Sequence, residues 1–215
     1  MAFEIVQIQP RIFYAKFEEP QHMLLSTYRI DGARLEQNLE YENYRQYIKS
    51  YMSKFSVNGY CIYGKDIRLF LKKFKKKKAI SEELTFAMSI LNITGEAGLT
   101  SRSKFTVIVC YNTEGSIAFN HEMAHSLFYV DYKFRMKVLR LFKHIKTDMK
   151  QKMFDDLAKR DYRFRGIDDT AFIDEAFCRL ATENLLKKGF SEDIKLPQRQ
   201  IAKFKKLYQD NLKKQ

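Results

Sequence analysis

The sequence has few of the residues that mark fibrous, disordered or disulfide-bonded proteins. Its 215 residues include only 8 Gly, 3 Pro and 3 Cys. The low Gly and Pro counts exclude collagen-like and low-complexity chains. The cysteines, Cys61, Cys110 and Cys178, form no CxxC pair. An odd number of isolated cysteines predicts reduced thiols, without a disulfide framework or a cysteine-based metal site.

Long apolar runs are also absent. The longest uninterrupted run, Val107 to Tyr111, is far too short to cross a bilayer. The N-terminus lacks the basic start and apolar stretch of a signal peptide. We therefore expect no transmembrane segment and a cytoplasmic location. Export by a route that needs no signal peptide is also compatible with the sequence. A length nearer one domain than two predicts a single domain over residues 1–215.

Positive charge is in excess, with 39 Lys and Arg against 26 Asp and Glu and a formal net charge of +13. Much of the excess lies after Asp131 and in the run from Lys72 to Lys78. Such a surface can attract an acidic partner, although a solvated helix end and loop is the favoured explanation of the run. No nucleic-acid-binding motif accompanies the charge, so nucleic acid is not an expected partner.

The order of predicted elements indicates an α+β fold with a small mixed or antiparallel sheet and a mostly helical C-terminal half. Residues 1–100 form an N-terminal part of strands and helices, 101–190 a core that carries the site, and 191–215 a basic C-terminal helix. Apolar or β-branched runs predict strands at Phe3 to Ile8, Ile12 to Phe17, Met23 to Ile30, Tyr60 to Tyr63 and, most clearly, Phe105 to Tyr111.

The residues that carry chemistry are His121-Glu122-Met123-Ala124-His125. Histidines four positions apart on a helix point the same way, so both imidazoles can bind one metal ion. Glu122 lies about 100° round the helix from His121, where its carboxylate can face a water on that metal. Zn²⁺ accepts such ligands and lowers the pKa of its water to about 7. The motif uses two of only four histidines and predicts a zinc site.

A zinc site needs at least a third protein ligand. The favoured candidate is Glu175, because an acid at the border of a buried helical face needs a partner. Asp174 is an alternative, either as a ligand or as a partner of an imidazole N–H. Asp131 and His144 are weaker candidates. Glu175 could instead pair with Arg179 at the surface.

The HExxH motif, followed about fifty residues later by Asp174-Glu175, resembles the gluzincin branch of zincin metallopeptidases. The succession of Phe105 to Tyr111, His121 to Val130 and Phe134 to Val138 is similar to an uncharacterised HExxH family of bacterial and viral proteins. The resemblance covers Lys104 to Glu183.

The chain departs from the gluzincin pattern at one position. Gluzincins commonly carry an acid one turn after the ligand glutamate, and this sequence has Arg179 there. The acid that orients a ligand histidine would then be Asp174, Asp168 or Asp169.

The resemblance implies a zincin-like fold, with the small sheet packed on the active-site helix, and a zinc metalloprotease activity. His121, His125 and Glu175 would hold Zn²⁺, and Glu122 would take the proton of the zinc-bound water and deliver it to the leaving amine. The strand Phe105 to Tyr111 would be a sheet edge that pairs with an extended chain. The expected partner is therefore a peptide or protein substrate.

Two alternatives belong to other classes of protein. The first is a zincin-like domain that binds zinc without cleaving peptides and serves as an interaction or regulatory module. The second is a basic protein that binds nucleic acid or an acidic surface and in which the HExxH sequence is coincidental. The substitution Glu122→Gln separates a protease from a zinc module, because it removes cleavage and leaves zinc bound.

Overall fold

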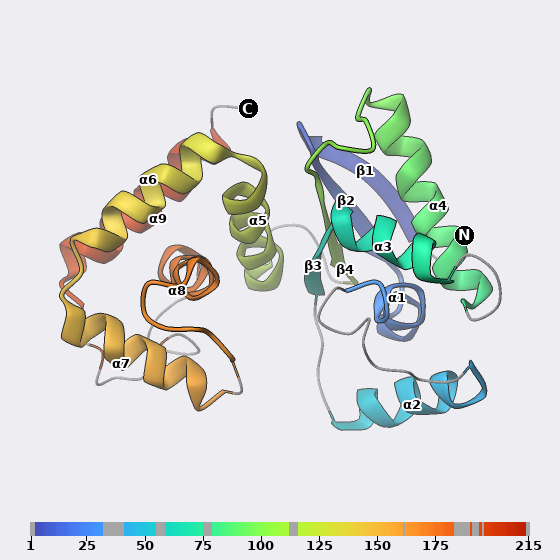
Figure 1. The fold of residues 1–215 in the computed structure, drawn as a ribbon, viewed down its shortest axis with the longest axis horizontal. Helices are drawn as coiled ribbons and strands as arrows, with labels where there is room; N and C mark the ends of the chain where they lie inside the picture. The colour runs from blue at the N-terminus through green and yellow to red at the C-terminus, as the bar shows by residue number, and fades with distance from the viewer. Residues whose placement is uncertain are drawn as a thin grey trace. The chain divides into compact units, whose positions relative to one another are not determined.

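The computed structural model describes most of the chain, namely residues 3–31, 41–54, 59–74, 79–111, 116–160, 162–182, 190, 194 and 196–213. The chain divides into two compact units, Met1–Phe119 and Asn120–Gln215 (Figure 1). In the described residues the first unit contains a four-stranded sheet with helices, and the second contains helices alone. The predicted mixture of helices with a small sheet, and the helical C-terminal half, are therefore confirmed. The single domain over 1–215 stays a prediction.

The sheet of the first unit is mixed. Its strands are β1 (Phe3–Gln9), β2 (Ile12–Phe17), β3 (Gly59–Tyr63) and β4 (Thr106–Cys110), in the order β1-β2-β4-β3. β2 and β4 run parallel, whereas β1 pairs with β2 and β3 pairs with β4 in antiparallel orientation. All four strands coincide with runs that the sequence predicts as strands.

β4 lies inside the sheet, between β2 and β3. All of its residues are buried, from Thr106 to Cys110. The prediction that this segment is a sheet edge open to an extended peptide is therefore wrong, because its backbone is already paired on both sides. The unbroken apolar run is itself the reason, since a strand without polar alternation is typical of a position covered on both faces.

The first unit contains helices α1 (Pro20–Thr27), α2 (Tyr41–Lys54), α3 (Gly64–Phe74) and α4 (Ser81–Glu96). The prediction of a strand from Met23 to Ile30 is wrong, because most of that run lies in α1 and the rest follows it. Pro20 stands at the start of α1, where its fixed φ suits a helix and its missing N–H is not needed. The helix buries Met23, Leu24 and Leu25 in succession, and a short, wholly buried run shows no period that separates helix from strand.

A buried ion pair joins the segment after α1 to α4. Arg29 and Glu83 are 1% and 0% exposed, and the Arg29 Nε atom donates to Glu83 Oε1 at 2.7 Å. The Arg29 guanidinium also lies 4.4 Å from the centre of the Tyr44 ring on α2. Glu83 further accepts a hydrogen bond from the Ile80 amide. The Arg29–Glu83 pair therefore links the segment after α1, α2 and α4.

The second unit contains most of α5 (Ile117–Val130), which begins three residues before the unit boundary. It also contains α6 (Tyr132–Lys143), α7 (Thr147–Ala158), α8 (Thr170–Thr182) and α9 (Gln198–Leu212). α6 and α9 lie side by side (Figure 1). Phe204 of α9 packs its ring against Phe142 of α6 and Phe177 of α8. These aromatic contacts form the interior against which α8, the carrier of the predicted third ligand, is held.

Two predicted absences can be compared with the described residues. None of the described helices is long and apolar enough to cross a membrane. The three cysteines all lie in described segments, and none forms a disulfide.

We predict that Glu83→Gln lowers the free energy of unfolding by about 3 kcal/mol, because it leaves the Arg29 charge buried without its counter-ion. Urea denaturation measures the loss. Glu96→Gln, at the exposed end of the same helix, is the matched control and should change stability by less than about 0.5 kcal/mol. Equal effects of the two substitutions would contradict the role given to the ion pair.

Candidate metal centre

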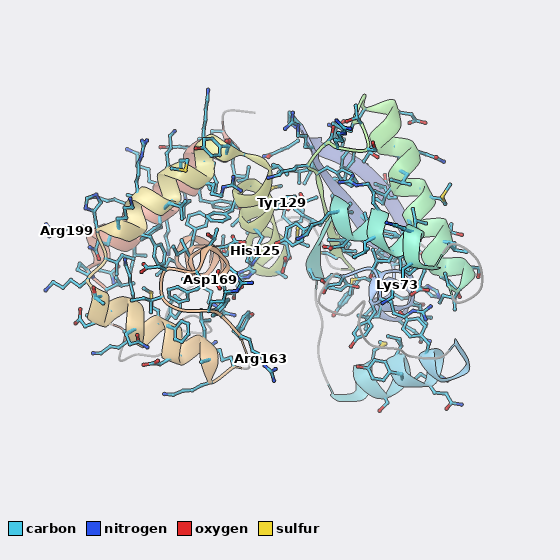
Figure 2. The ribbon with its side chains drawn as sticks, viewed as in Figure 1. Lys73, His125, Tyr129, Arg163, Asp169 and Arg199 are labelled. Atoms are coloured by element: carbon cyan, nitrogen blue, oxygen red, sulfur yellow. The ribbon has the colours of Figure 1, made fainter. Side chains whose placement is uncertain are left out.

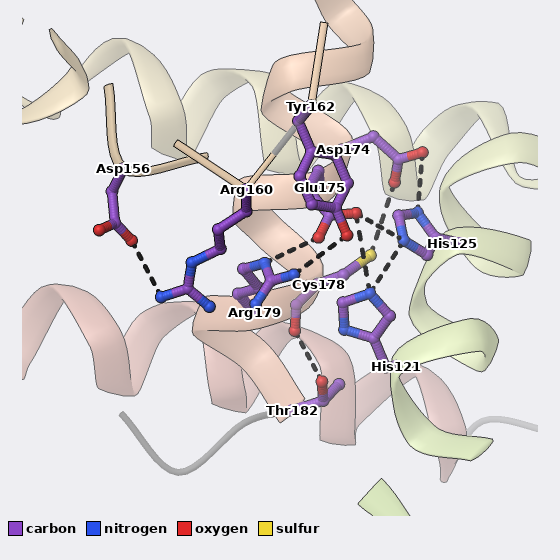
Figure 3. Close-up of polar contacts among 10 residues, drawn as sticks. All are labelled: His121, His125, Asp156, Arg160, Tyr162, Asp174, Glu175, Cys178, Arg179 and Thr182. Atoms are coloured by element: carbon purple, nitrogen blue, oxygen red, sulfur yellow. Dashed lines mark hydrogen bonds and ion pairs between the residues drawn. The ribbon is translucent and has the colours of Figure 1, made fainter. Parts of the chain in front are cut away.

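Helix α5 places the two histidines of the HExxH motif on one face. Ser116 caps its first turn, because the Ser116 Oγ atom accepts a hydrogen bond from the Phe119 amide at 3.1 Å. His121 and His125 follow one turn apart, and their Nε2 atoms lie 3.1 Å from each other (Figure 3). Two ring nitrogens this close require a shared proton or a cation between them, because two N–H groups would repel each other.

Helix α8 brings an acidic pair to the same place. Asp169 caps this helix by accepting a hydrogen bond from the Ala171 amide at 3.0 Å. The helix buries the side chains of Phe172, Ala176 and Phe177. Its Glu175 then faces α5. His125 and Asp169, both labelled in Figure 2, mark the two segments that build the site.

Glu175 completes a triangle of ligand atoms with the two histidines. Its Oε2 atom lies 3.2 Å from His125 Nε2 and 3.8 Å from His121 Nε2. In the plane of these three atoms, the point equidistant from them is about 2.0 Å from each, which is the length of a zinc–nitrogen or zinc–oxygen bond. These three residues could therefore hold a metal ion.

Asp174 contacts the other side of the His125 ring. Its Oδ2 atom lies 3.1 Å from His125 Nδ1, although the direction falls outside hydrogen-bond geometry. The contact leaves Nε2 of His125 turned toward Glu175. Carboxylates in this position commonly orient a ligand histidine. Of the three acids considered for that role, Asp169 caps α8 and Asp168 is exposed, so the structure brings only Asp174 to the ring among them.

The charges of the cluster are shared between acids and imidazoles. Burial alone would raise the pKa of Glu175, but hydrogen bonds and charges from His121 and His125 outweigh it and hold that pKa well below its usual range. Burial would lower the pKa of His125, and the Asp174 carboxylate reverses this and raises it well above the usual value. The Glu175 carboxylate is thus ionised, as a metal ligand must be, whereas His125 would lose its proton when it binds a metal ion.

Arg179 holds the second oxygen of Glu175. Its Nε atom donates to Glu175 Oε1 at 2.7 Å, and its Nη2 atom donates to the Tyr162 hydroxyl at 3.1 Å. Arg179 and Glu175 are 9% and 6% exposed. Glu175 and Arg179 do form a pair, but the prediction that the pair lies at the surface is wrong, because both side chains are buried. The pair is compatible with a ligand role for Glu175, since Oε1 faces Arg179 while Oε2 faces the histidines.

Cys178 belongs to a second group that could hold a metal ion, together with His125 and Asp174. Its Sγ atom lies 3.6 Å from Asp174 Oδ1. The thiol is fully buried, and burial raises its pKa well above the usual value. A metal ion would deprotonate a thiol that it binds, so the choice between the two groups rests on geometry. The helical spacing of the two histidines, with ligand atoms 3.1 to 3.8 Å apart, favours the group of His121, His125 and Glu175.

The remaining predicted residues divide clearly. Glu122 is half-buried next to His121. Burial raises its pKa more than the charges of His125 and His121 lower it, so its carboxylate interacts electrostatically with both histidines. Asp131 caps α6 by accepting the Phe134 amide at 3.0 Å. His144 is exposed at the end of α6. The structure brings neither Asp131 nor His144 into the groups that could hold a metal.

Sequence reasoning missed Tyr162. This residue lies in the segment before α8, and no motif or periodicity distinguishes it from the other twelve tyrosines. Its contact with Arg179 depends on how that segment folds against α8, which no local pattern encodes.

Comparison of the chain with models of known protein families, with curated proteins and with solved structures found no match. The chemistry of the site is therefore inferred from its own geometry.

We predict that Arg179→Met lowers the free energy of unfolding by about 3 kcal/mol in metal-free protein, because Glu175 then keeps a buried charge without its nearest cation. Thermal or urea unfolding in the presence of a chelator measures the change. Arg163→Met, an exposed arginine nearby in the sequence, is the control and should be close to neutral. A neutral result for Arg179→Met would show that Glu175 does not depend on this pair.

Proposed function

We propose that the protein is a zinc-dependent metalloprotease of zincin type that hydrolyses peptide bonds. The observation that supports this proposal best is the convergence of three ligand atoms, two imidazole Nε2 atoms and one carboxylate oxygen, around a point about 2.0 Å from each. A peptide or protein substrate and a cytoplasmic location belong to the same proposal.

His121, His125 and Glu175 would hold the ion. Three protein ligands of this kind leave a coordination position open, which distinguishes a catalytic zinc site from a structural one. Zinc bound there supplies a Lewis acid that polarises water and the substrate carbonyl. Asp174 orients the His125 ring, and Arg179 fixes the rotation of the Glu175 carboxylate.

Glu122 is the proposed general base and acid. Burial raises its pKa, so that its carboxylate can accept a proton from the attacking water and then return it to the leaving amine. Glu122 follows His121 on α5, about 100° round the helix from it. It is not one of the three residues that form the metal-binding group.

We predict about one zinc per chain in the wild type, measured by elemental analysis after zinc is added back to chelator-treated protein. Glu175→Ala should lower zinc affinity at least about 100-fold, because it removes one of three ligands. Asp168→Ala, an exposed acid just before α8, should keep full affinity. Absence of zinc from the wild type would overturn the proposal.

We predict that Glu122→Gln retains zinc and lowers peptide cleavage by a factor of about 100 to 10,000, because the amide cannot take a proton. Mass spectrometry of a mixed peptide library detects cleavage at whichever peptide sequence the protein prefers. Glu96→Gln replaces an exposed glutamate at the end of α4, in the first unit, and is the control that should cleave as the wild type does.

The two measurements also separate the competing functions. Zinc binding by the wild type without cleavage of any peptide would favour the zinc module that does not cleave. Unchanged cleavage in Glu122→Gln would contradict the role of this residue.

A further inference from the structure

The first unit contains a pocket that the proposed metal centre does not use. It has a volume of about 710 Å³ and lies among α3, α4 and the segment that follows α4. Pockets that bind small molecules have volumes of about 300 to 1,000 Å³ and are mainly apolar. The size of this pocket therefore suits one small molecule.

Aliphatic side chains form most of the apolar lining. α3 contributes Leu71, α4 contributes Leu84, Met88 and Leu91, and Leu99 follows α4. Met88 is 50% exposed, so part of its side chain at the pocket is open to solvent. Unbranched methionine adapts to irregular ligands. The lining favours a flexible hydrocarbon chain.

The charged residues of the lining are both cationic. Arg68 and Lys72 lie one turn apart on α3, and none of the described residues that line the pocket is acidic. The Arg68 guanidinium is held in place, because Nη2 donates to the Ser103 carbonyl at 3.3 Å and the group lies 5.4 Å from the centre of the Phe105 ring. A fixed cation beside an apolar pocket suits an anionic head group.

We propose that this pocket binds an anionic amphiphile with a linear hydrocarbon chain, of the class of long-chain fatty acids. The hydrocarbon chain of the ligand lies against the leucines and Met88, and the carboxylate of the ligand pairs with Arg68 and Lys72. The proposal rests on the first unit alone, so it stands or falls independently of the zinc site.

Isothermal titration of the whole protein with dodecanoate, below its micelle concentration, tests the proposal. We expect saturable binding of one molecule per chain. Decanoate and octanoate should bind progressively more weakly, by up to about fourfold for each CH₂ removed, which is the factor for complete burial of a methylene. Dodecanol should bind more weakly than dodecanoate because it lacks the charge.

Two variants locate the ligand. Met88→Trp enlarges a side chain that lines the pocket and should lower dodecanoate affinity at least about tenfold. The double variant Arg68→Met with Lys72→Met keeps apolar side chains and should weaken dodecanoate about fivefold or more while leaving dodecanol unchanged. Lys65→Met, an exposed residue of the same helix outside the lining, is the matched control and should bind as the wild type does.

Circular dichroism and thermal unfolding establish that each variant is folded, and the two variants test different parts of the pocket, so failure of one to fold leaves the other decisive. Absence of saturable binding overturns the proposal and favours an apolar helix of a partner protein as the occupant. Equal affinities for dodecanol and dodecanoate, or binding that neither folded variant weakens, overturn it as well.

Discussion

The structure of the second unit depends on the burial of one ionised carboxylate. Glu175 is 6% exposed, and an isolated buried charge is too costly to persist. Its two oxygens therefore need partners on two sides: Arg179 supplies one, and the histidines of α5 supply the other. These contacts tie α5, α8 and the segment at Tyr162 together. The groups that suit a metal ion thus also fix the helices that carry them.

The candidate site could be predicted from sequence as far as local geometry and charge reach. Helical spacing placed His121 and His125 on one face, and an acid on an otherwise buried helix singled out Glu175. The pairing of Asp174 with His125 was one of several alternatives and could not be selected without tertiary structure. The dual use of Glu175, with Arg179 on one oxygen and imidazoles on the other, depends on side-chain packing that no spacing encodes.

The fold shows the same division. The strands were predictable because β-branched and aromatic residues occur in short runs, and the break after α5 coincides with Asp131 as a helix cap. The strand prediction for Met23 to Ile30 is wrong, because a fully buried segment shows no period that separates helix from strand. Pro20, which stands at the first position of α1, is the local signal that favours a helix start. The position of β4 inside the sheet depends on long-range pairing with β2 and β3, which composition alone does not set.

X-ray absorption at the zinc edge of the metal-loaded protein tests the central claim most directly, because it reports the atoms around the ion. We expect two imidazole nitrogens and carboxylate or water oxygens at about 2.0 to 2.2 Å, and no sulfur. That result would agree with His121, His125 and Glu175 as the ligands. A sulfur neighbour at about 2.3 Å would put Cys178 in the coordination sphere and contradict the metal centre described.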